Sequence, residues 1–331
     1  MTGLRELVES LPLPAPDERA ARAVAERAAN VLRPVGAFAR LDEVAAWMAS
    51  WQSTATPHAD RPALVLFAGD HGVAAEGVSA YPAEITGSVL RALEDGVATA
   101  NAVAAAVGAS THLVDVGVGS PTGNIAIEPA MDDERLHAAF DVGRATVAGL
   151  DADLLVVGEL GIGNTTSAAA LTSCLLGMAP DVCTGRGTGV DDAALRRKID
   201  VVSRACARVA ACHPIDALRE LGGTELAAIV GAIVEARLRR IPVLLDGYAT
   251  TAAAAVLART RPDGVRHCLA GHRSAEPGHR RLLDALGMRP LLELDLRLGE
   301  GTGALAAVPL VRIAIRAVTD VATFDEWAVN R

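Results

Sequence analysis

Two glycine-rich loops followed by polar side chains are the parts of the sequence best suited to chemistry. The first, 158–166, reads Gly-Glu-Leu-Gly-Ile-Gly-Asn-Thr-Thr and opens an alanine-rich segment. Small residues let backbone amides approach an anion, and the start of a helix adds favourable partial charge. The second, 184–189, precedes a helix expected from Asp191 to about Ala211, which carries Lys198. Both loops are therefore candidates for holding an anion, although spacing alone fits a solvated Lys198 better than a phosphate ligand.

The first loop also resembles a dinucleotide fingerprint, which makes a nicotinamide-dependent dehydrogenase one alternative. The third glycine of that fingerprint is replaced by Thr166. The acidic residue expected at the end of the next strand is also missing, because the segment 175–180 does not have the pattern of a strand. The chain also lacks a Walker loop and the paired acids with which ordinary phosphoribosyltransferases hold pyrophosphorylated ribose. If ribose is transferred here, we expect its donor to be a finished nucleotide.

The elements that must position these loops are short apolar runs alternating with helical segments. Runs of this length suit strands buried on both faces, and the alternation favours crossover units of a parallel sheet. We therefore predict an α/β fold with an open, mostly parallel Rossmann-like sheet and helices on both faces. The expected strands are 63–68, 111–116, 154–157, 242–245, 265–270 and 291–294.

Polar clusters directly follow these runs, where ligands of open parallel sheets bind. They occupy 69–72, 158–159, 246–247, 271–274 and 299–301. Residues 1–60 instead indicate helices, with proline and acids at 16–18 marking one start and apolar residues at helical spacing over 41–51. We predict a small helical domain at 1–60, joined by the C-terminal helices, and an α/β catalytic domain at 61–331.

Composition narrows the functional class. The 331-residue chain has a net charge of −9 with both signs interspersed, which disfavours broad nucleic-acid binding. Apolar runs stay below the roughly 20 charge-free residues of a membrane helix, and the first residues lack the pattern of a signal peptide. The five cysteines have neither C-x-x-C nor zinc-ligand spacing. We therefore expect a cytoplasmic protein with no metal, no cofactor and no nucleic-acid or membrane partner.

Taken together, several motifs resemble one family over nearly the whole chain, the nicotinate-nucleotide:dimethylbenzimidazole phosphoribosyltransferases. The resemblance implies transfer of the 5-phosphoribosyl group from nicotinate mononucleotide to a benzimidazole-type base during assembly of the cobamide lower ligand. It also implies a metal-free homodimer. The matching stretches are 69–73, 77–82, 158–166, 185–189 with Lys198, 222–225, 245–247, 272–279 and 296–303.

The resemblance also assigns roles to residues. Glu300, between Gly299 and Gly301, would be the general base that takes a proton from the azole; the structural alternative is a cap of the helix starting near Thr302. Such a base is worth roughly 10²–10⁴-fold in rate. Ribose and phosphate would be held by Glu159, Gly161, Gly163, Asn164, Thr165, Thr166, Gly187 and Lys198. Further candidates for substrate binding are Asp70, His71, Ser79, Tyr81, Asp246, Ser274, Glu276 and Leu298.

Two stretches depart from the family pattern. The family often has Lys-Pro-x-Gly-Ser-Leu near its start, where residues 33–38 read Arg-Pro-Val-Gly-Ala-Phe. A glutamine that lines the acceptor site soon after the threonine matching Thr86 is missing, because residues 87–89 read Gly-Ser-Val. We therefore expect a non-standard choice of acceptor base. A nucleotide-binding regulatory protein of the same fold is a second alternative, which the intact Glu300 and glycine loops disfavour.

Overall fold

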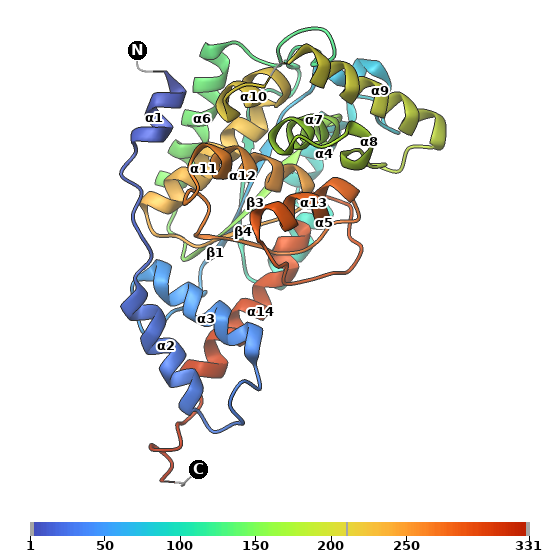
Figure 1. The fold of residues 1–331 in the computed structure, drawn as a ribbon. Helices are drawn as coiled ribbons and strands as arrows, with labels where there is room; N and C mark the ends of the chain where they lie inside the picture. Colours follow the sequence, from blue (N-terminus) through green and yellow to red (C-terminus); the bar gives the residue numbers. More distant parts are fainter. Residues whose placement is uncertain (1–2, 210, 329–331) are drawn as a thin grey trace.

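One wholly parallel sheet organises the chain, confirming the predicted α/β architecture. The computed structural model describes residues 3–209 and 211–328. Its five strands lie in the order β2-β1-β3-β4-β5 (Figure 1). They are β1 (Pro62–Ala68), β2 (Ser110–Asp115), β3 (Leu154–Leu160), β4 (Val243–Leu245) and β5 (Cys268–Ala270). The chain passes from β1 to one neighbour and then to the other, so the strand order reverses between β1 and β3, where open sheets bind ligands.

Helices connect these strands and cover both faces of the sheet. Before and between the first strands lie α1 (Leu4–Ser10), α2 (Glu18–Asn30), α3 (Ala39–Gln52), η1 (Gly72–Glu76), α4 (Ile85–Glu94) and α5 (Thr99–Ala106). Around β3 lie α6 (Asp133–Ala148), α7 (Asn164–Leu176), α8 (Pro180–Cys183), α9 (Asp192–Arg208), α10 (Pro214–Leu221) and α11 (Thr224–Leu238). The last are α12 (Tyr248–Thr260), α13 (Pro277–Leu286) and α14 (Thr302–Thr319).

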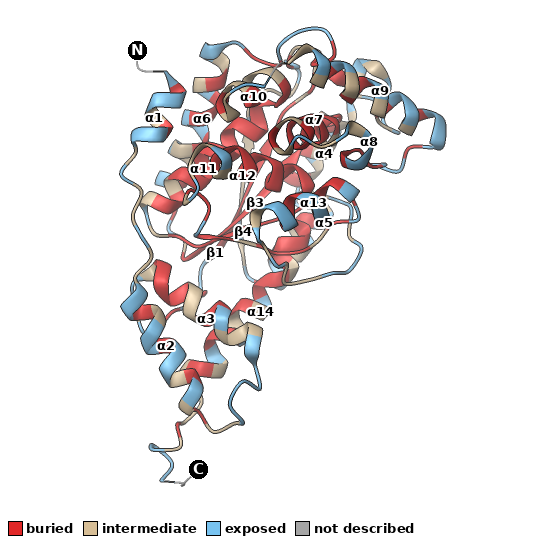
Figure 2. Ribbon diagram, in the orientation of Figure 1, coloured by how far each residue is buried: buried red, intermediate tan, exposed pale blue. Residues whose placement is uncertain are grey.

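Alternate strand residues point into two separate cores, as the period of a strand requires. In β1, Val65 and Phe67 pack into the core formed with α6, α7, α10, α11 and α12. Leu64 and Leu66 pack into the opposite core, formed with α2, α3, α4, α5 and α14. Figure 2 shows the strands and the helices behind them as the most buried part of the molecule. This double burial explains why the strands are continuous apolar runs.

The C-terminal segment returns to pack beside α2 and α3, whereas α1 lies at the opposite end of the molecule (Figure 1). Leu32 donates its amide to the Ala322 carbonyl at 2.9 Å, and Arg27 Nε donates to the Val318 carbonyl at 2.9 Å. Below the sheet in Figure 1, α2, α3 and the end of α14 form the tapered part of the molecule. Their apolar residues continue into the core on the second sheet face, so the boundary at residue 60 stays a prediction.

The last helix also passes a test for membrane helices. Among the described residues, α14 alone is long and apolar enough to cross a membrane, but 56% of it is buried inside the protein. It packs against α3, α5 and β3, and it carries Arg312 and Arg316. Its buried apolar residues belong to the core on the second sheet face.

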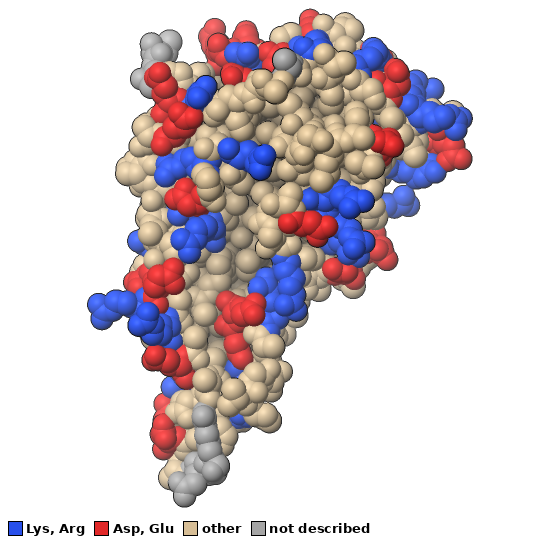
Figure 3. Space-filling model, viewed as in Figure 1, with Lys and Arg blue, Asp and Glu red and all other residues tan. Residues whose placement is uncertain are grey.

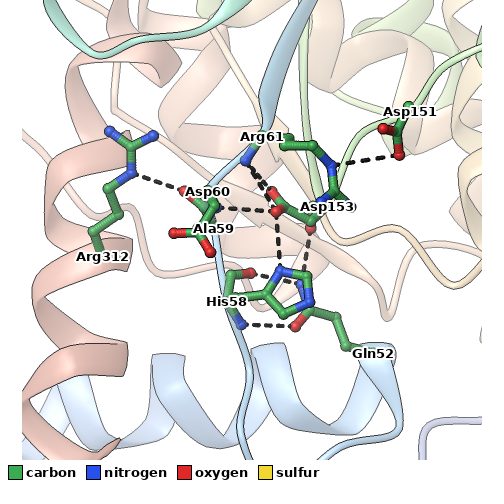
Figure 4. A network of polar contacts seen from close by, with 8 residues as sticks. All are labelled: Gln52, His58, Ala59, Asp60, Arg61, Asp151, Asp153 and Arg312. Atoms are coloured by element: carbon green, nitrogen blue, oxygen red, sulfur yellow. Dashed lines mark hydrogen bonds and ion pairs between the residues drawn. The ribbon is translucent and has the colours of Figure 1, made fainter. Parts of the chain in front are cut away.

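A buried carboxylate fixes the segment that enters the sheet. Asp153, just before β3, accepts hydrogen bonds from the amides of Asp60 and Arg61 at 2.9 Å, and its Oδ2 lies 2.9 Å from His58 Nδ1 (Figure 4). Gln52, at the end of α3, donates to the carbonyls of His58 and Asp153 at 2.7 and 3.0 Å. These contacts hold the amino ends of β1 and β3 together and leave their carboxyl ends to the site.

Three expectations about elements need correction. Residues 291–294 are not a strand, because only Leu292 forms a bridge, to His272, and Leu294 is 58% exposed. The Leu291 and Leu292 amides donate to the carbonyls of Ala270 and Gly271 after β5, but the exposed residues 293 and 294 do not continue this pairing as a strand. The fifth strand is shorter than 265–270. The helix expected to reach about Ala211 ends at Arg208, and Ala210 lies outside the described residues.

Candidate active site

A cleft lies outside the carboxyl ends of β3 and β4, where α7 and α12 begin and where the loops before α9 and α14 approach. Its walls bring together residues from six separate parts of the sequence. The predicted site residues that line it are Ser79, Glu159, Gly161, Gly163, Asn164, Thr165, Gly187, Ser274, Glu276, Leu298 and Glu300. Most of the predicted site therefore converges on one hollow, although the role of each residue stays a prediction.

The remaining predicted residues do not line the cleft. Lys198 and Thr166 lie buried behind its wall, and Asp246 lies fully buried below its floor. His71 is also buried, with Nε2 2.7 Å from Glu225 Oε1 and Nδ1 3.1 Å from Ser167 Oγ. In the same region, Asp70 Oδ2 accepts from the Gly119 amide at 2.8 Å. Tyr81 is 54% exposed.

Some lining residues were missing from the sequence prediction. His272, Arg297 and Thr188 line the cleft, as do Gly247 and Tyr248. The signal was present for several, because His272 begins the 272–279 motif and Arg297 belongs to the 296–303 motif. Motif membership does not tell which side chains face inward, and that orientation is what the folded structure adds.

Glu300 stands on a sharply turned backbone. Gly299, Glu300 and Gly301 have φ values of +88°, +58° and +76°, so the middle residue adopts a conformation that non-glycine residues rarely use. A Cβ on Gly158 of β3 would lie 2.7 Å from the Gly301 nitrogen, so the turn needs glycine there to approach the strand. Such strain is characteristic of functional sites. The turn places the Glu300 carboxyl in the cleft, with Oε2 hydrogen-bonded to no described residue.

Glu300 does not cap α14, which was the structural alternative for it. That helix has no side-chain cap at its first residue, and Asp246 Oδ1 instead accepts the Ala304 amide at 2.9 Å. Burial raises the pKa of the Glu300 carboxyl and the nearby Asp246 raises it further, while the Ala100 backbone opposes them. A raised pKa brings a carboxylate closer to the value that suits a general base near neutral pH.

Glu159 differs from Glu300 although both line the cleft. Its carboxyl accepts a hydrogen bond from Asn164 Nδ2 at the start of α7. Burial, followed by the charges of Asp246 and Glu225, raises the pKa of Glu159 to about 8. A carboxyl with a pKa near 8 is mostly protonated at neutral pH and can donate a hydrogen bond.

The start of α7 forms the other end of the cleft. Lys198, which is 1% exposed, donates from Nζ to Thr165 Oγ1 at 2.8 Å. Burial lowers the pKa of Lys198, while the charge of Glu276 opposes that shift. Glu276 Oε1 accepts the Gly187 amide at 2.7 Å and so fixes the second glycine loop over the lysine. The helix start and the buried cation together suit an anion such as phosphate.

A histidine network supports the wall formed by α13. His279 Nδ1 receives the Ser274 amide at 3.0 Å, and Nε2 lies 3.0 Å from Thr251 Oγ1. Burial is the main cause that lowers the pKa of His279 to about 3, so this ring is neutral near pH 7. His272 Nε2 lies 3.4 Å from Asp246 Oδ1. The network holds the 272–276 segment against the cleft.

Potential metal ligands gather elsewhere. His58, Asp60 and Asp153 bring three ligand atoms within 4.8 Å of one another. That group lies at the amino ends of β1 and β3 (Figure 4), and the Asp153 oxygens already accept backbone amides.

On the face drawn in Figure 3, acidic and basic side chains are interspersed.

Comparison with known proteins points to one family. The phosphoribosyltransferase family model matches residues 13–329. The nicotinate-nucleotide–dimethylbenzimidazole phosphoribosyltransferases of Mesorhizobium japonicum and Methylorubrum extorquens share 47% and 46% identity with the chain. The matches cover 97% and 100% of this chain and 96% of each relative. The crystal structure of CobT from Thermus thermophilus superposes with a TM-score of 0.91 at 42% identity, covering 95% of this chain and 99% of that one.

Proposed function

Because the chain belongs to the nicotinate-nucleotide–dimethylbenzimidazole phosphoribosyltransferase family, we propose that its cleft is where the phosphoribosyl group is transferred. The protein is an enzyme of cobamide lower-ligand assembly that moves this group from nicotinate mononucleotide to a benzimidazole-type base. The observation that carries the assignment of the cleft is that Glu300, whose buried Oε2 has no hydrogen-bond partner among the described residues, lines it together with the start of α7.

At the phosphate end, we assign nucleotide binding to the loop 161–166 and Lys198. The Gly163–Thr166 segment begins α7. Its Asn164 and Thr166 amides donate to the carbonyls of Gly161 and Gly163, whereas the amides of Gly163 and Thr165 donate to no described residue and are available to phosphate oxygens. The buried ammonium of Lys198 is held at Thr165 and faces the same loop. A buried cation is costly unless paired, and a bound phosphate would supply the partner.

At the reacting centre, nicotinate leaves with the electron pair of its bond to C1′, which returns the ring nitrogen to neutrality. One azole nitrogen forms the new bond to C1′, and the other loses its proton to the Glu300 carboxylate. The leaving group is already activated by its quaternary nitrogen. Positive charge develops at the ribose, and the Glu300 carboxylate in the cleft wall suits it electrostatically.

Proton removal by Glu300 is the step that a variant can test. Glu300→Gln keeps the shape of the side chain, so the fold and nucleotide binding should remain while turnover falls roughly 10²-fold or more. The measurement is release of nicotinate from nicotinate mononucleotide in the presence of dimethylbenzimidazole, with nucleotide binding measured by calorimetry. Near-normal turnover would remove Glu300 from the mechanism, and wild-type protein that releases no nicotinate with any base would contradict the assigned activity.

For the acceptor end we propose that Val78, Ile162 and Leu298 form the apolar surface against which the base lies. The glutamine expected by resemblance is replaced within 87–89, on α4. Thr86, beside that segment, is buried and its Oγ1 accepts the Ile162 amide at 3.2 Å. The acceptor surface is therefore linked to α4 through the loop before α7.

We further propose that the enzyme works in the cytoplasm as a homodimer.

A further inference from the structure

One cation at the cleft has no part in the chemistry proposed for Glu300 and Lys198. Arg297 is the only lysine or arginine among the described residues that line the cleft, whereas Glu159, Glu276 and Glu300 contribute carboxyls. Arg297 is exposed and forms no hydrogen bond or ion pair with any described residue. A guanidinium left free beside several acids is available to a ligand.

The position of Arg297 connects the two sides of the cleft. It belongs to the same loop as Glu300, three residues earlier in the chain. A Cβ on Gly189 would lie 3.6 Å from Arg297 Nη1, so the side chain extends from the Glu300 loop toward the second glycine loop. The guanidinium therefore lies between the Glu300 loop and the second glycine loop.

The substrate has two anionic groups, and the structure provides for one of them elsewhere. The α7 start and the buried Lys198 suit the phosphate. The second anion is the carboxylate on the nicotinate ring. Because the carboxyls of Glu276 and Glu300 line the cleft, the ring carboxylate would be unfavourably placed there unless a cation accompanied it.

We propose that Arg297 binds the ring carboxylate of nicotinate mononucleotide and so selects acidic pyridine nucleotides over their amides. This inference rests on the proposed function of the cleft. The planar guanidinium matches a carboxylate with two parallel hydrogen bonds. A carboxamide has no negative charge and only one acceptor oxygen. Its NH₂ group would face the N–H donors of the guanidinium, so the amide analogue can form neither the ion pair nor the second hydrogen bond.

The test compares two donors that differ only in that group, nicotinate mononucleotide and nicotinamide mononucleotide, with benzimidazole as the acceptor. Arg297→Gln should lower the ratio of their kcat/KM values roughly 10- to 100-fold, almost entirely through loss with the acidic donor. Arg297→Lys should retain more of the preference for the acidic donor than Arg297→Gln, since lysine keeps the positive charge but cannot form the two parallel hydrogen bonds of a guanidinium. Arg196→Gln is a matched control, because Arg196 is an exposed arginine on α9 that does not line the cleft.

Several outcomes would overturn the proposal. They are equal kcat/KM values for both donors in the wild type, an unchanged ratio in Arg297→Gln, or equal losses with both donors, which would place Arg297 at the phosphate. Calorimetry with free nicotinate and free nicotinamide measures the same preference without turnover. Wild-type protein that binds nicotinate selectively through Arg297 but turns over neither donor would refute the proposed function and leave this inference standing.

Discussion

At the residue scale, the site depends on a few charged groups held away from water. Lys198 and Glu159 are both buried, and each has a pKa displaced toward its neutral form, mainly by burial. Groups of this kind are expensive for the folded state unless a ligand or neighbour compensates them. Their presence at a cleft therefore indicates binding or catalysis more strongly than their residue types do.

Lys198 should contribute more to the binding of nicotinate mononucleotide than to the binding of free nicotinate. Lys198→Met retains an apolar stem for packing but removes the charge. We expect it to weaken binding of nicotinate mononucleotide by roughly 1.5–3 kcal/mol while affecting free nicotinate little, because nicotinate carries no phosphate. Calorimetry with both ligands measures the difference. Arg196→Gln, an exposed change on the same helix, serves as control, and equal losses for the two ligands would argue against a phosphate role.

Glu159 should make stability depend on pH. Its pKa in the folded protein is about 8, above the ordinary 4.5, so the folded state binds the proton more tightly than the unfolded state. The stability contribution is complete below about pH 4.5 and is lost as the pH rises through about 8. Glu159→Gln mimics the protonated acid, so its melting temperature relative to wild type should increase from pH 5 to pH 8.5.

Calorimetric scans across that range measure this effect of Glu159. Glu134→Gln, an exposed change on α6, controls for the loss of one negative charge. A constant difference between Glu159→Gln and wild type at all pH values would show that burial does not hold this carboxyl protonated.

At the element scale, loops that follow strands bring distant residues to one place. The turn 299–301 approaches β3 because Gly158 has no side chain, and the Glu300 amide donates to the Glu159 carbonyl at 3.2 Å. The same strand leads into the loop that begins α7. The proposed base and the proposed phosphate site are thus both fixed to β3, which limits how far either can move.

The acceptor side depends on α4 and should show broad base choice. A pocket lined by apolar side chains rejects an analogue weakly, by roughly 10–200-fold per methylene, whereas a lost polar contact rejects it strongly. With the orienting glutamine replaced in 87–89, dimethylbenzimidazole and unsubstituted benzimidazole should be used within about 30-fold of each other. Direct competition with chromatographic separation of the products tests this. A preference above about a thousandfold would mean that another residue orients the base.

At the scale of the whole molecule, exposed apolar side chains are consistent with association. Val35 and Phe38 beside α3 and Ile313 on α14 are 71%, 39% and 47% exposed. A second copy of the chain could cover such groups. We predict a dimer, with a mass of twice the 34.0 kDa of one chain, in light scattering at micromolar concentration. A mass that stays at one chain up to the highest soluble concentration would refute it.

The sequence by itself determined the layers of this protein and the edge of the sheet at which the cleft lies. Continuous apolar runs dictate strands buried on both faces, and the residues after such runs meet at one edge of a parallel sheet. This inference from the apolar runs correctly placed Glu159 and Glu300 at the cleft. It failed at 291–294, where the exposed residues 293 and 294 do not continue the pairing as a strand.

Only the tertiary structure decided which charged groups meet and which are buried. Lys198 is buried against Thr165 of the cleft wall, Asp246 rather than Glu300 caps α14, and Arg297 lines the cleft without a partner among the described residues. Each of these facts depends on contacts between segments far apart in the chain. Periodicity and motif spacing describe only neighbours along the chain, whereas burial and the pairing of charges are set by packing between distant elements.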